Sequence, residues 1–350
     1  MASIKGKLFE FFVYRLLVSC GFKPVTPDGL LVFSGSPGLM VQGAGAPHNT
    51  DVLLSPPIQT PFYYPTRLIV ECKCYNGSIG LTIIRNALGL RDDINNFEIV
   101  TDTILRNRKN NRNTGPKYYD MKRYVYQVAV ASIDGFKSTV YPFAQAHRIP
   151  LISFSQSPIF SGIRRAISEL DDIANASINN NLVQQINTYL TNKIQHPEQH
   201  TSLGDLNFDE FNAYINEIAD IERRLTVGLL EDGTILFLLQ ADHEDNSLVN
   251  NFSHNDGCTI HWSNEDPATW ILRNQGTTYY FELPKPIYDS WEQSIGKQRK
   301  DALKIKRNFF SKIVLFRRTD DNSENISIIR LSEQFMENAE ESLHTQSMDE

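Results

Sequence analysis

The pattern of hydrophobic and polar positions divides the chain into parts of different character. Residues 5–22 have a helical composition and are apolar on nearly every side. Short apolar runs typical of buried strands then occur at residues 51–54, 68–74, 124–133 and 151–155. A helical segment at 134–150 separates the last two runs. This order predicts an α/β fold in which a mixed sheet is flanked by helices.

After residue 157 the pattern changes twice. Residues 158–225 contain three helical segments separated by turn formers, and they predict a helical connector. The next stretch, LTVGLLEDGTILFLLQ, is typical of two strands joined by a turn. We therefore expect a first domain at 1–157 and a β-rich α+β C-terminal domain at 226–335. The acidic tail, 336–350, is expected to be disordered.

Composition narrows the choice of compartment and partners. The 350 residues are 41% hydrophobic and carry a formal net charge of −7. A chain with this net charge does not attract nucleic acid through its overall electrostatic field. The chain has four cysteines and contains neither a secretory signal nor an 18-residue apolar run. We expect a cytoplasmic protein that does not associate with membranes and binds any nucleic acid through local patches.

One strand carries charges where a buried strand needs none. In RLIVECKCY, at residues 67–75, alternation places Glu71 and Lys73 on one face and Cys72 and Cys74 on the other. A neighbouring Glu and Lys are costly when buried without partners and cheap when they line a wet cleft. An exposed edge strand with an incidental charge pair is the alternative interpretation.

Asp51 supplies the context that favours a site. It follows a Gly-rich turn and begins the apolar run 51–54, so pairing of that run with residues 68–74 places it beside Glu71. Two carboxylates suit Mg²⁺, which keeps several waters and recruits phosphate oxygens. A nearby Lys73 neutralises charge that develops in the transition state. This set suits phosphodiester hydrolysis.

Three further side chains are candidates with an alternative for each. Glu10 lies within the apolar N-terminal helix and needs a partner, either Lys7 or Arg15 on the helix surface or a metal site. His48, three residues before Asp51, is a candidate for substrate contact or an ordinary turn residue. Gln127 begins an apolar strand, where it either reaches the cleft or is structural.

These motifs resemble the PD-(D/E)XK nuclease superfamily, and within it the Mrr-like restriction endonucleases. The resemblance rests on Glu10 in a leading helix, GAGAPHNTD ending at Asp51, and VECK at 70–73, and it covers about residues 4–156. It implies a restriction-endonuclease-like sheet, Asp51 and Glu71 as ligands of Mg²⁺ with Mn²⁺ as a substitute, Lys73 as the catalytic lysine and Glu10 as an auxiliary acid. Thr50 stands where the superfamily's name has Pro.

Two basic segments are candidates for contact with nucleic acid. In the first, cations interleaved with tyrosines can neutralise phosphates while the rings stack on bases. The expected phosphate-binding residues are Arg106, Arg108, Lys109, Arg112, Lys117, Lys122 and Arg123. The second segment, 296–318, predicts contact with a nucleic-acid backbone or an acidic partner. A solvated surface is the alternative for both.

Two functions of different class follow from these observations. The first is a metal-dependent endonuclease that hydrolyses DNA in restriction or antiviral defence, with DNA favoured over RNA and with the C-terminal domain binding substrate or a protein partner. A double-strand cut by one active site per chain is made most simply by a homodimer. The second is a non-catalytic nucleic-acid-binding or structural subunit of a defence complex.

Overall fold

The structure is a computed structural model that describes residues 4–338 with interruptions. The segments outside the described residues are 36–37, 60–63, 97–123, 156–157, 177–179, 198–205, 231–233, 242–257, 264–268, 275–276, 293–298, 319–323, 331, 333 and 335. All seven cations expected to bind phosphate in the first basic segment, and the tail after residue 338, therefore lie outside the described residues.

The N-terminal part is built on a five-stranded mixed sheet in the order β1-β5-β6-β7-β8. Its strands are β1 (Lys23–Pro24), β5 (Val52–Ser55), β6 (Thr66–Lys73), β7 (Val125–Ser132) and β8 (Leu151–Ser153). The pairs β1–β5 and β5–β6 are antiparallel, whereas β6–β7 and β7–β8 are parallel. Helices α2 (Leu81–Asn95) and α4 (Val140–Ala146) make the two parallel connections. The mixed sheet with flanking helices is confirmed.

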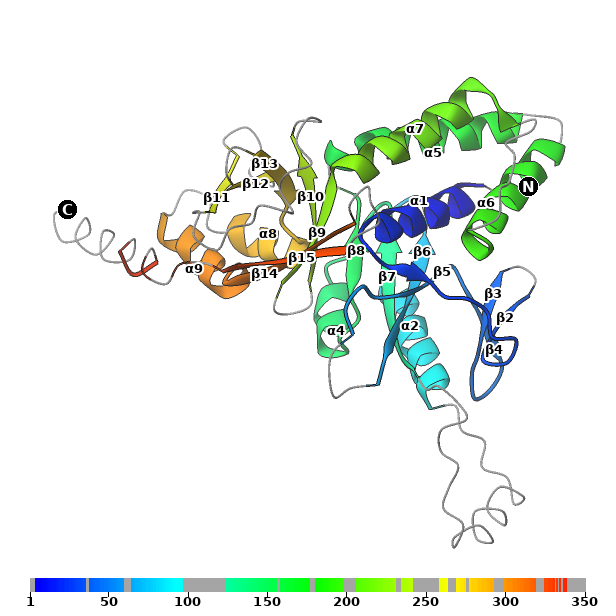
Figure 1. Cartoon of the computed structure of the whole chain (residues 1–350), viewed down its shortest axis with the longest axis horizontal. Coiled ribbons are helices and arrows are strands. Elements are labelled where there is room, and N and C mark those ends of the chain that lie inside the picture. Colours follow the sequence, from blue (N-terminus) through cyan, green and yellow to red (C-terminus); the bar gives the residue numbers. More distant parts are fainter. Residues whose placement is uncertain are drawn as a thin grey trace, which may run out of the picture.

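Helices cover both faces of this sheet (Figure 1). On one face lies α1 (Lys5–Ser19), joined by α5 (Ser161–Ala176), α6 (Asn180–Gln195) and α7 (Asp209–Arg224). The other face packs against α2 and α4. The three helices predicted after residue 157 thus pack directly on α1, where Arg15 binds Glu222 and the Tyr214 hydroxyl donates to the Leu8 carbonyl oxygen.

A small antiparallel sheet stands beside the main one. It consists of β2 (Val32–Ser34), β3 (Leu39–Gln42) and β4 (Pro47–Thr50), in that order. The apolar pattern did not predict this sheet, because its strands are short and alternate with turns. The pattern predicted that Asp51 is the first residue of its strand. In the structure β5 begins at Val52, and Asp51 lies between β4 and β5.

The C-terminal part is a curled, half-barrel sheet of seven antiparallel strands in the order β11-β12-β13-β10-β9-β14-β15. The predicted hairpin is β9 (Leu225–Leu230) and β10 (Ile235–Gln240). The other strands are β11 (Thr259–Trp262), β12 (Thr269–Asn274), β13 (Thr277–Glu282), β14 (Lys312–Arg318) and β15 (Glu324–Arg330). Helices α8 (Lys285–Glu292) and α9 (Arg299–Phe309) contribute Ile287 and Ile305 to the core on one face of this sheet.

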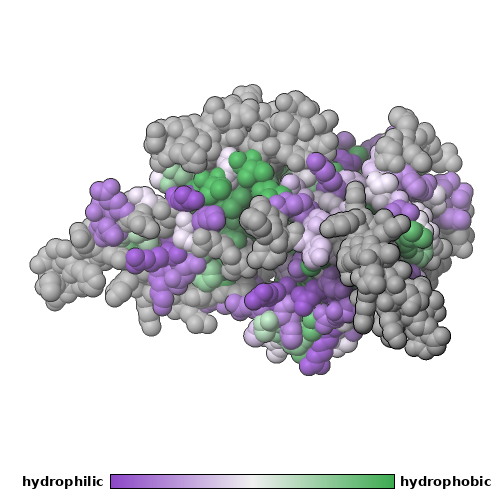
Figure 2. All heavy atoms as spheres, turned by 60° about the horizontal axis from the view of Figure 1, so that its bottom comes forward, coloured by the Kyte–Doolittle hydropathy of each residue, from purple (hydrophilic) through white to green (hydrophobic). Residues whose placement is uncertain are grey.

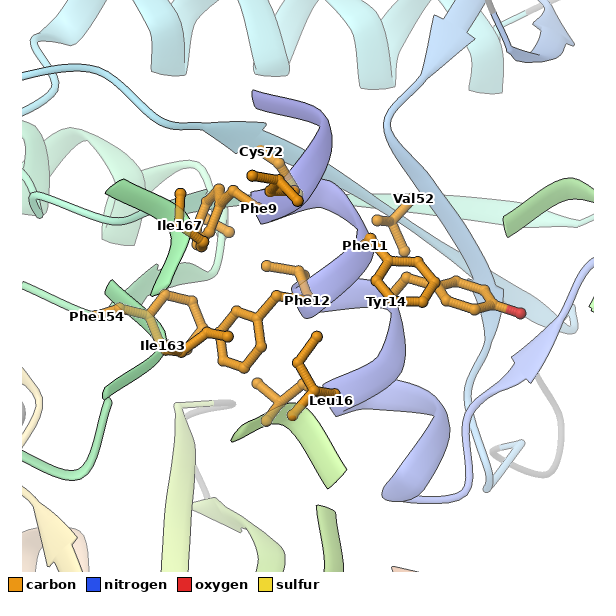
Figure 3. Packing of buried hydrophobic residues seen from close by; sticks show 14 of the residues in the cluster. Phe9, Phe11, Phe12, Tyr14, Leu16, Val52, Cys72, Phe154, Ile163 and Ile167 are labelled. Atoms are coloured by element: carbon orange, nitrogen blue, oxygen red, sulfur yellow. The ribbon is translucent and has the colours of Figure 1, made fainter. Parts of the chain in front are cut away.

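One apolar core joins the two parts of the chain. Phe154, which follows β8, lies with its ring centroid 5.3 Å from that of Phe12 on α1 and 5.7 Å from that of Phe237 on β10. Figure 3 shows Phe154, Phe12 and Ile163 gathered together on one side of α1, to its left in this view. The same buried cluster includes Val227 on β9. The helical layer and the C-terminal sheet therefore share buried surface with the N-terminal part of the chain.

On the face that Figure 2 presents, the described residues are mostly hydrophilic, and the most concentrated hydrophobic area lies near the middle. Large exposed hydrophobic side chains on the C-terminal sheet include Tyr280, Ile326 and Ile328. In the described part of the chain, no helix combines the length and apolar character that a membrane span requires.

We expect the two parts to unfold in one transition because they share this core. All three tryptophans, Trp262, Trp270 and Trp291, belong to the C-terminal part, so fluorescence reports on that part, whereas far-UV circular dichroism also reports on α1, α2 and α5–α7. Phe154→Ala should lower the free energy of unfolding by about 3–5 kcal/mol, and it should shift the urea midpoints of both signals together.

Tyr75→Ala is the control, because this side chain is 53% exposed and its loss should cost under about 0.5 kcal/mol. A fall of the dichroism midpoint in Phe154→Ala with an unchanged fluorescence midpoint would contradict the shared core.

Candidate active site

The pairing of β5 with β6 places Asp51 beside Glu71. Val52 lies opposite Val70 in the antiparallel register, so the residue before Val52 lies opposite the residue after Val70. Val52, Val70 and Cys72 are buried against α1, and alternation turns Glu71 away from that core. The sequence prediction that these two carboxylates lie side by side is confirmed.

Lys73 completes the cluster. Its Nζ lies 2.9 Å from Glu71 Oε2 and 3.3 Å from Asp51 Oδ2. The backbone N–H of Cys72 donates to Asp51 Oδ2 at 2.8 Å, which fixes the position of that carboxylate. The relative solvent exposure of the side chain is only 15% for Asp51, 19% for Glu71 and 19% for Lys73. The cluster is therefore a shielded set of two negative charges and one positive charge.

The surroundings shift the pKa values of this cluster. Burial and the nearby charge of Asp51 raise the pKa of Glu71, and they outweigh the opposing effect of Lys73. Burial alone would lower the pKa of Lys73, but the charges of Asp51 and Glu71 outweigh it and raise that pKa. Lys73 is therefore held as an ammonium ion and cannot serve as a base at neutral pH.

Glu10 approaches the same cluster from α1. Its carboxylate binds the Lys7 ammonium, whereas Arg15 binds Glu222, so Lys7 is the surface partner. Burial, reinforced by the charge of Asp51, raises the pKa of Glu10 to about 7. Glu10 therefore has both a surface partner and an electrostatic link to the cluster, and its carboxyl gains and loses a proton near neutral pH.

His48 also belongs to this neighbourhood. Its Nε2 lies 2.6 Å from Asp93 Oδ2 near the end of α2, and a positive charge on this ring would lower the pKa of Glu71. The Gly45 N–H donates to Asp93 as well, at 3.2 Å. A Cβ at Gly43 would lie 2.1 Å from Asp93 Oδ2, so only glycine permits this close approach. The Gly-rich loop is thus fastened to α2 through Asp93.

The donor set fits a hard divalent cation held by two carboxylates. One ammonium ion contacts both Asp51 and Glu71, so the two carboxylates converge on a common point. Among the described residues, no three His, Cys, Asp or Glu side chains form a set that could hold a metal ion. Glu10 therefore does not complete a three-carboxylate site. A Mg²⁺ ion bound here would take its remaining ligands from water and phosphate, as it usually does.

Other candidates lie elsewhere. Gln127 pairs with Leu68 on β6, whereas Glu71 pairs with Val130, so Gln127 is three positions away along the sheet, or about 10 Å. It does not reach the carboxylate cluster. In the second basic segment, Lys304 is exposed on α9 while burial lowers the pKa of Lys306, so these cations do not form a uniformly solvated face.

Sequence reasoning missed two contributions to the site. Asp93 stands in RDDINNF, where nothing distinguishes it from a solvated helix residue. Its role depends on the docking of the Gly-rich loop, which is a long-range contact. The hydrogen bond from Cys72 N–H to Asp51 comes from the backbone, and it is therefore independent of residue type.

Comparisons with known proteins add little. No protein-family model matches the chain, and no curated protein matches it. A solved structure described as "Crystal Structure of Protein of Unknown Function AF1548" is similar over 62% of this chain and 97% of that chain, with 16% identity and a TM-score of 0.33. A score this low supports no conclusion about fold or function.

The raised pKa of Glu10 predicts a pH-dependent effect of Glu10→Gln on stability. The folded protein holds this proton more tightly than the unfolded chain, so Glu10 favours folding below about pH 4.5, and this contribution is lost as pH rises through about 7. The free energy of unfolding of the variant minus that of the parent should be larger at about pH 8 than at about pH 5, by on the order of 1–3 kcal/mol. Urea titrations at both values measure this gain.

Glu222→Gln is the matched control, since Glu222 is similarly shielded but accepts two hydrogen bonds from Arg15 at 2.5 and 2.6 Å. Its loss should destabilise the protein at both pH values. A pH-independent effect of Glu10→Gln would show that the carboxyl does not titrate near neutrality in the folded protein.

Proposed function

We propose that this protein is a metal-dependent endonuclease of the PD-(D/E)XK superfamily, similar to Mrr-like restriction enzymes, that hydrolyses phosphodiester bonds of DNA. The observation that carries the proposal is the convergence of Asp51, Glu71 and Lys73 at the β5–β6 pair. The mixed sheet flanked by helices is compatible with a restriction-endonuclease-like fold. The proposed setting is cytoplasmic restriction or antiviral defence.

Asp51 and Glu71 would hold the Mg²⁺ ion, or Mn²⁺ in its place. Such an ion polarises the phosphate and makes a bound water more acidic when it is present. The Cys72 N–H keeps the Asp51 carboxylate oriented toward this position. A fixed orientation of this kind removes reorganisation from the reaction.

Lys73 provides a permanent positive charge beside the reacting phosphate. Since its pKa is raised, it donates hydrogen bonds, neutralises charge that develops on the phosphate oxygens and orients the attacking water. Glu10, with its pKa of about 7, is suited to take up or release a proton at neutral pH as the auxiliary acid. These roles assign acid–base work to Glu10 and charge stabilisation to Lys73.

The remaining parts of the proposal concern partners. The basic stretch from Arg106 to Arg123 would bind the nucleic-acid backbone, and the C-terminal sheet would bind substrate or a protein partner. Pairing of two chains would cut both DNA strands, since the described part of each chain holds one such cluster. DNA is favoured over RNA as the substrate.

A second candidate is a nucleic-acid-binding subunit that does not cut. Two observations favour it. The Lys73 ammonium already contacts both carboxylates, and the described residues provide no third ligand. In that case the three charges would stabilise the strand ends without catalysis.

Cleavage assays separate these candidates. With Mg²⁺ or Mn²⁺, we expect the parent to cut plasmid DNA more readily than RNA and to stop when the metal is chelated. Asp51→Ala, Glu71→Ala and Lys73→Ala should each lower the rate by about 10²–10⁴, because each removes a group that stabilises the transition state. Gel analysis of plasmid nicking and linearisation measures the rates.

Lys137→Ala is the control for a lost lysine, since Lys137 is exposed and outside the cluster. It should cut at the parent's rate. Cleavage that persists in Lys73→Ala and Asp51→Ala would place the activity elsewhere or in a contaminant. No cleavage of plasmid, single-stranded DNA or RNA would favour the second candidate.

Lys73→Met should separate metal binding from catalysis. Removing the ammonium leaves two carboxylates without their counter-ion, so Mn²⁺ affinity should equal or exceed the parent's while cleavage is lost. Titration calorimetry with Mn²⁺ measures the affinity. Asp51→Ala should lose both properties, and a loss of Mn²⁺ binding in Lys73→Met with its fold intact would contradict the assigned roles.

A further inference from the structure

One edge of the C-terminal sheet is formed by a long strand. Among the described residues, β15 pairs on one side with β14 and has no strand on the other side. It has seven residues, whereas the other edge strands of the three sheets, β1, β2, β4, β8 and β11, have two to four. In the part of the chain that the structure describes, the outer edge of β15 is therefore the longest row of backbone N–H and carbonyl groups without a neighbouring strand.

This edge lacks the features that keep strand edges apart. The strand, ENISIIR, contains neither proline nor lysine. Ile326 and Ile328 are 46% and 39% exposed, and alternation assigns both to the same face of the sheet. Natural sheet proteins usually blunt an edge with a short strand, a proline, a lysine or a covering segment. A long edge with exposed β-branched side chains indicates a strand that pairs with another chain.

The exposed isoleucines continue the apolar face that joins the two parts of the chain. On β14, Phe316 lies opposite Ile326, and Val314 lies opposite Ile328. Phe316 is buried in the core that the two parts share, and Val314 packs against this core. The other face of β15 is covered, since Ile329 is buried in the core to which α8 and α9 contribute. The apolar face thus runs from the buried core onto β15 and stops at the outer edge.

A second copy of the chain fits this edge. Two identical edge strands related by a two-fold axis run antiparallel, and the residues that lie opposite each other share a face. With the axis at Ser327, Ile326 of each copy lies opposite Ile328 of the other. Glu324 then falls at the position opposite Arg330 of the second copy. Moving the axis by one residue in either direction would put one of these charged residues opposite an isoleucine, so the sequence favours the register centred on Ser327.

We propose that two copies of this chain associate through antiparallel pairing of their β15 strands, which joins their C-terminal sheets into one. Pairing satisfies the outer backbone N–H and carbonyl groups and covers the isoleucines. Each copy uses its outer edge once, so the association ends at a dimer. A contact limited to two strands buries less surface than a standard interface, and we therefore expect a dissociation constant on the order of 10 µM.

This dimer is independent of the cleavage chemistry. β15 contains none of Asp51, Glu71, Lys73 or Glu10, and the pairing needs neither metal nor nucleic acid. Under the proposed function, the dimer would supply the second chain for a double-strand cut. Asp51→Ala should dimerise like the parent, so failure of the dimer and failure of the cleavage proposal are separate results.

Sedimentation velocity on the full chain tests the dimer, at about 1–100 µM protein with a chelator present. We expect the parent to shift from monomer to dimer over this range. Ile326→Lys combined with Ile328→Lys places like charges opposite each other across the two-fold axis, and it should weaken association about tenfold or more. Ile326→Lys combined with Ile328→Glu loses the same isoleucines but places opposite charges there, so it should associate about tenfold more tightly than the double-lysine variant.

Tyr280→Lys is the control for a lost exposed hydrophobic side chain. Tyr280 is 37% exposed on β13, which lies inside the same sheet, so this variant should dimerise like the parent. Circular dichroism verifies the fold of each variant. A parent that stays monomeric at the highest concentration, a double-lysine variant that dimerises like the parent, or a lysine–glutamate variant as weak as the double-lysine variant would each overturn the proposal. Equal weakening by Tyr280→Lys would also overturn it, because the face of the sheet and not its edge would then carry the contact.

Discussion

The register between β5 and β6 is the constraint on which the candidate site depends. Val52 opposite Val70 places Asp51 beside Glu71 and lets one lysine contact both carboxylates. A slip of one residue would turn Glu71 and Lys73 into the core beneath α1 and bring Cys72 outward. Burial of Val52, Val70 and Cys72 against α1 therefore fixes the register and, through it, the site.

The buried carboxylates near the site destabilise the folded state, whereas the apolar core stabilises it. Glu10 and Glu71 both have raised pKa values because burial disfavours their charged forms, so their ionised carboxylates destabilise the fold. The aromatic cluster around Phe154 offsets this cost, and it also ties α1 to the C-terminal sheet through Phe237. Clustered charge that weakens a well-packed fold is typical of a functional site.

Much of the N-terminal part could be predicted from the sequence, because its strands are apolar runs and its site residues stand at their ends. The mixed sheet, the meeting of Asp51, Glu71 and Lys73, and the 225–240 hairpin all followed from such local patterns. The β2–β4 sheet, the contact of His48 with Asp93 and the packing of α5–α7 on α1 did not, since they depend on contacts between distant segments. The helix predicted at 134–150 was too long, because Gly135 at a positive φ and the turn at Arg148 leave only Val140–Ala146 helical.

The most direct test of the proposed cleavage site is a crystal structure of the protein with Mn²⁺ and a short DNA duplex, with the anomalous signal used to locate the metal. We predict an anomalous peak in contact with the Asp51 and Glu71 carboxylates, and Lys73 Nζ moved from between them toward a phosphate oxygen. A structure at saturating Mn²⁺ in which Lys73 still bridges the two carboxylates and the metal lies elsewhere would contradict the proposal.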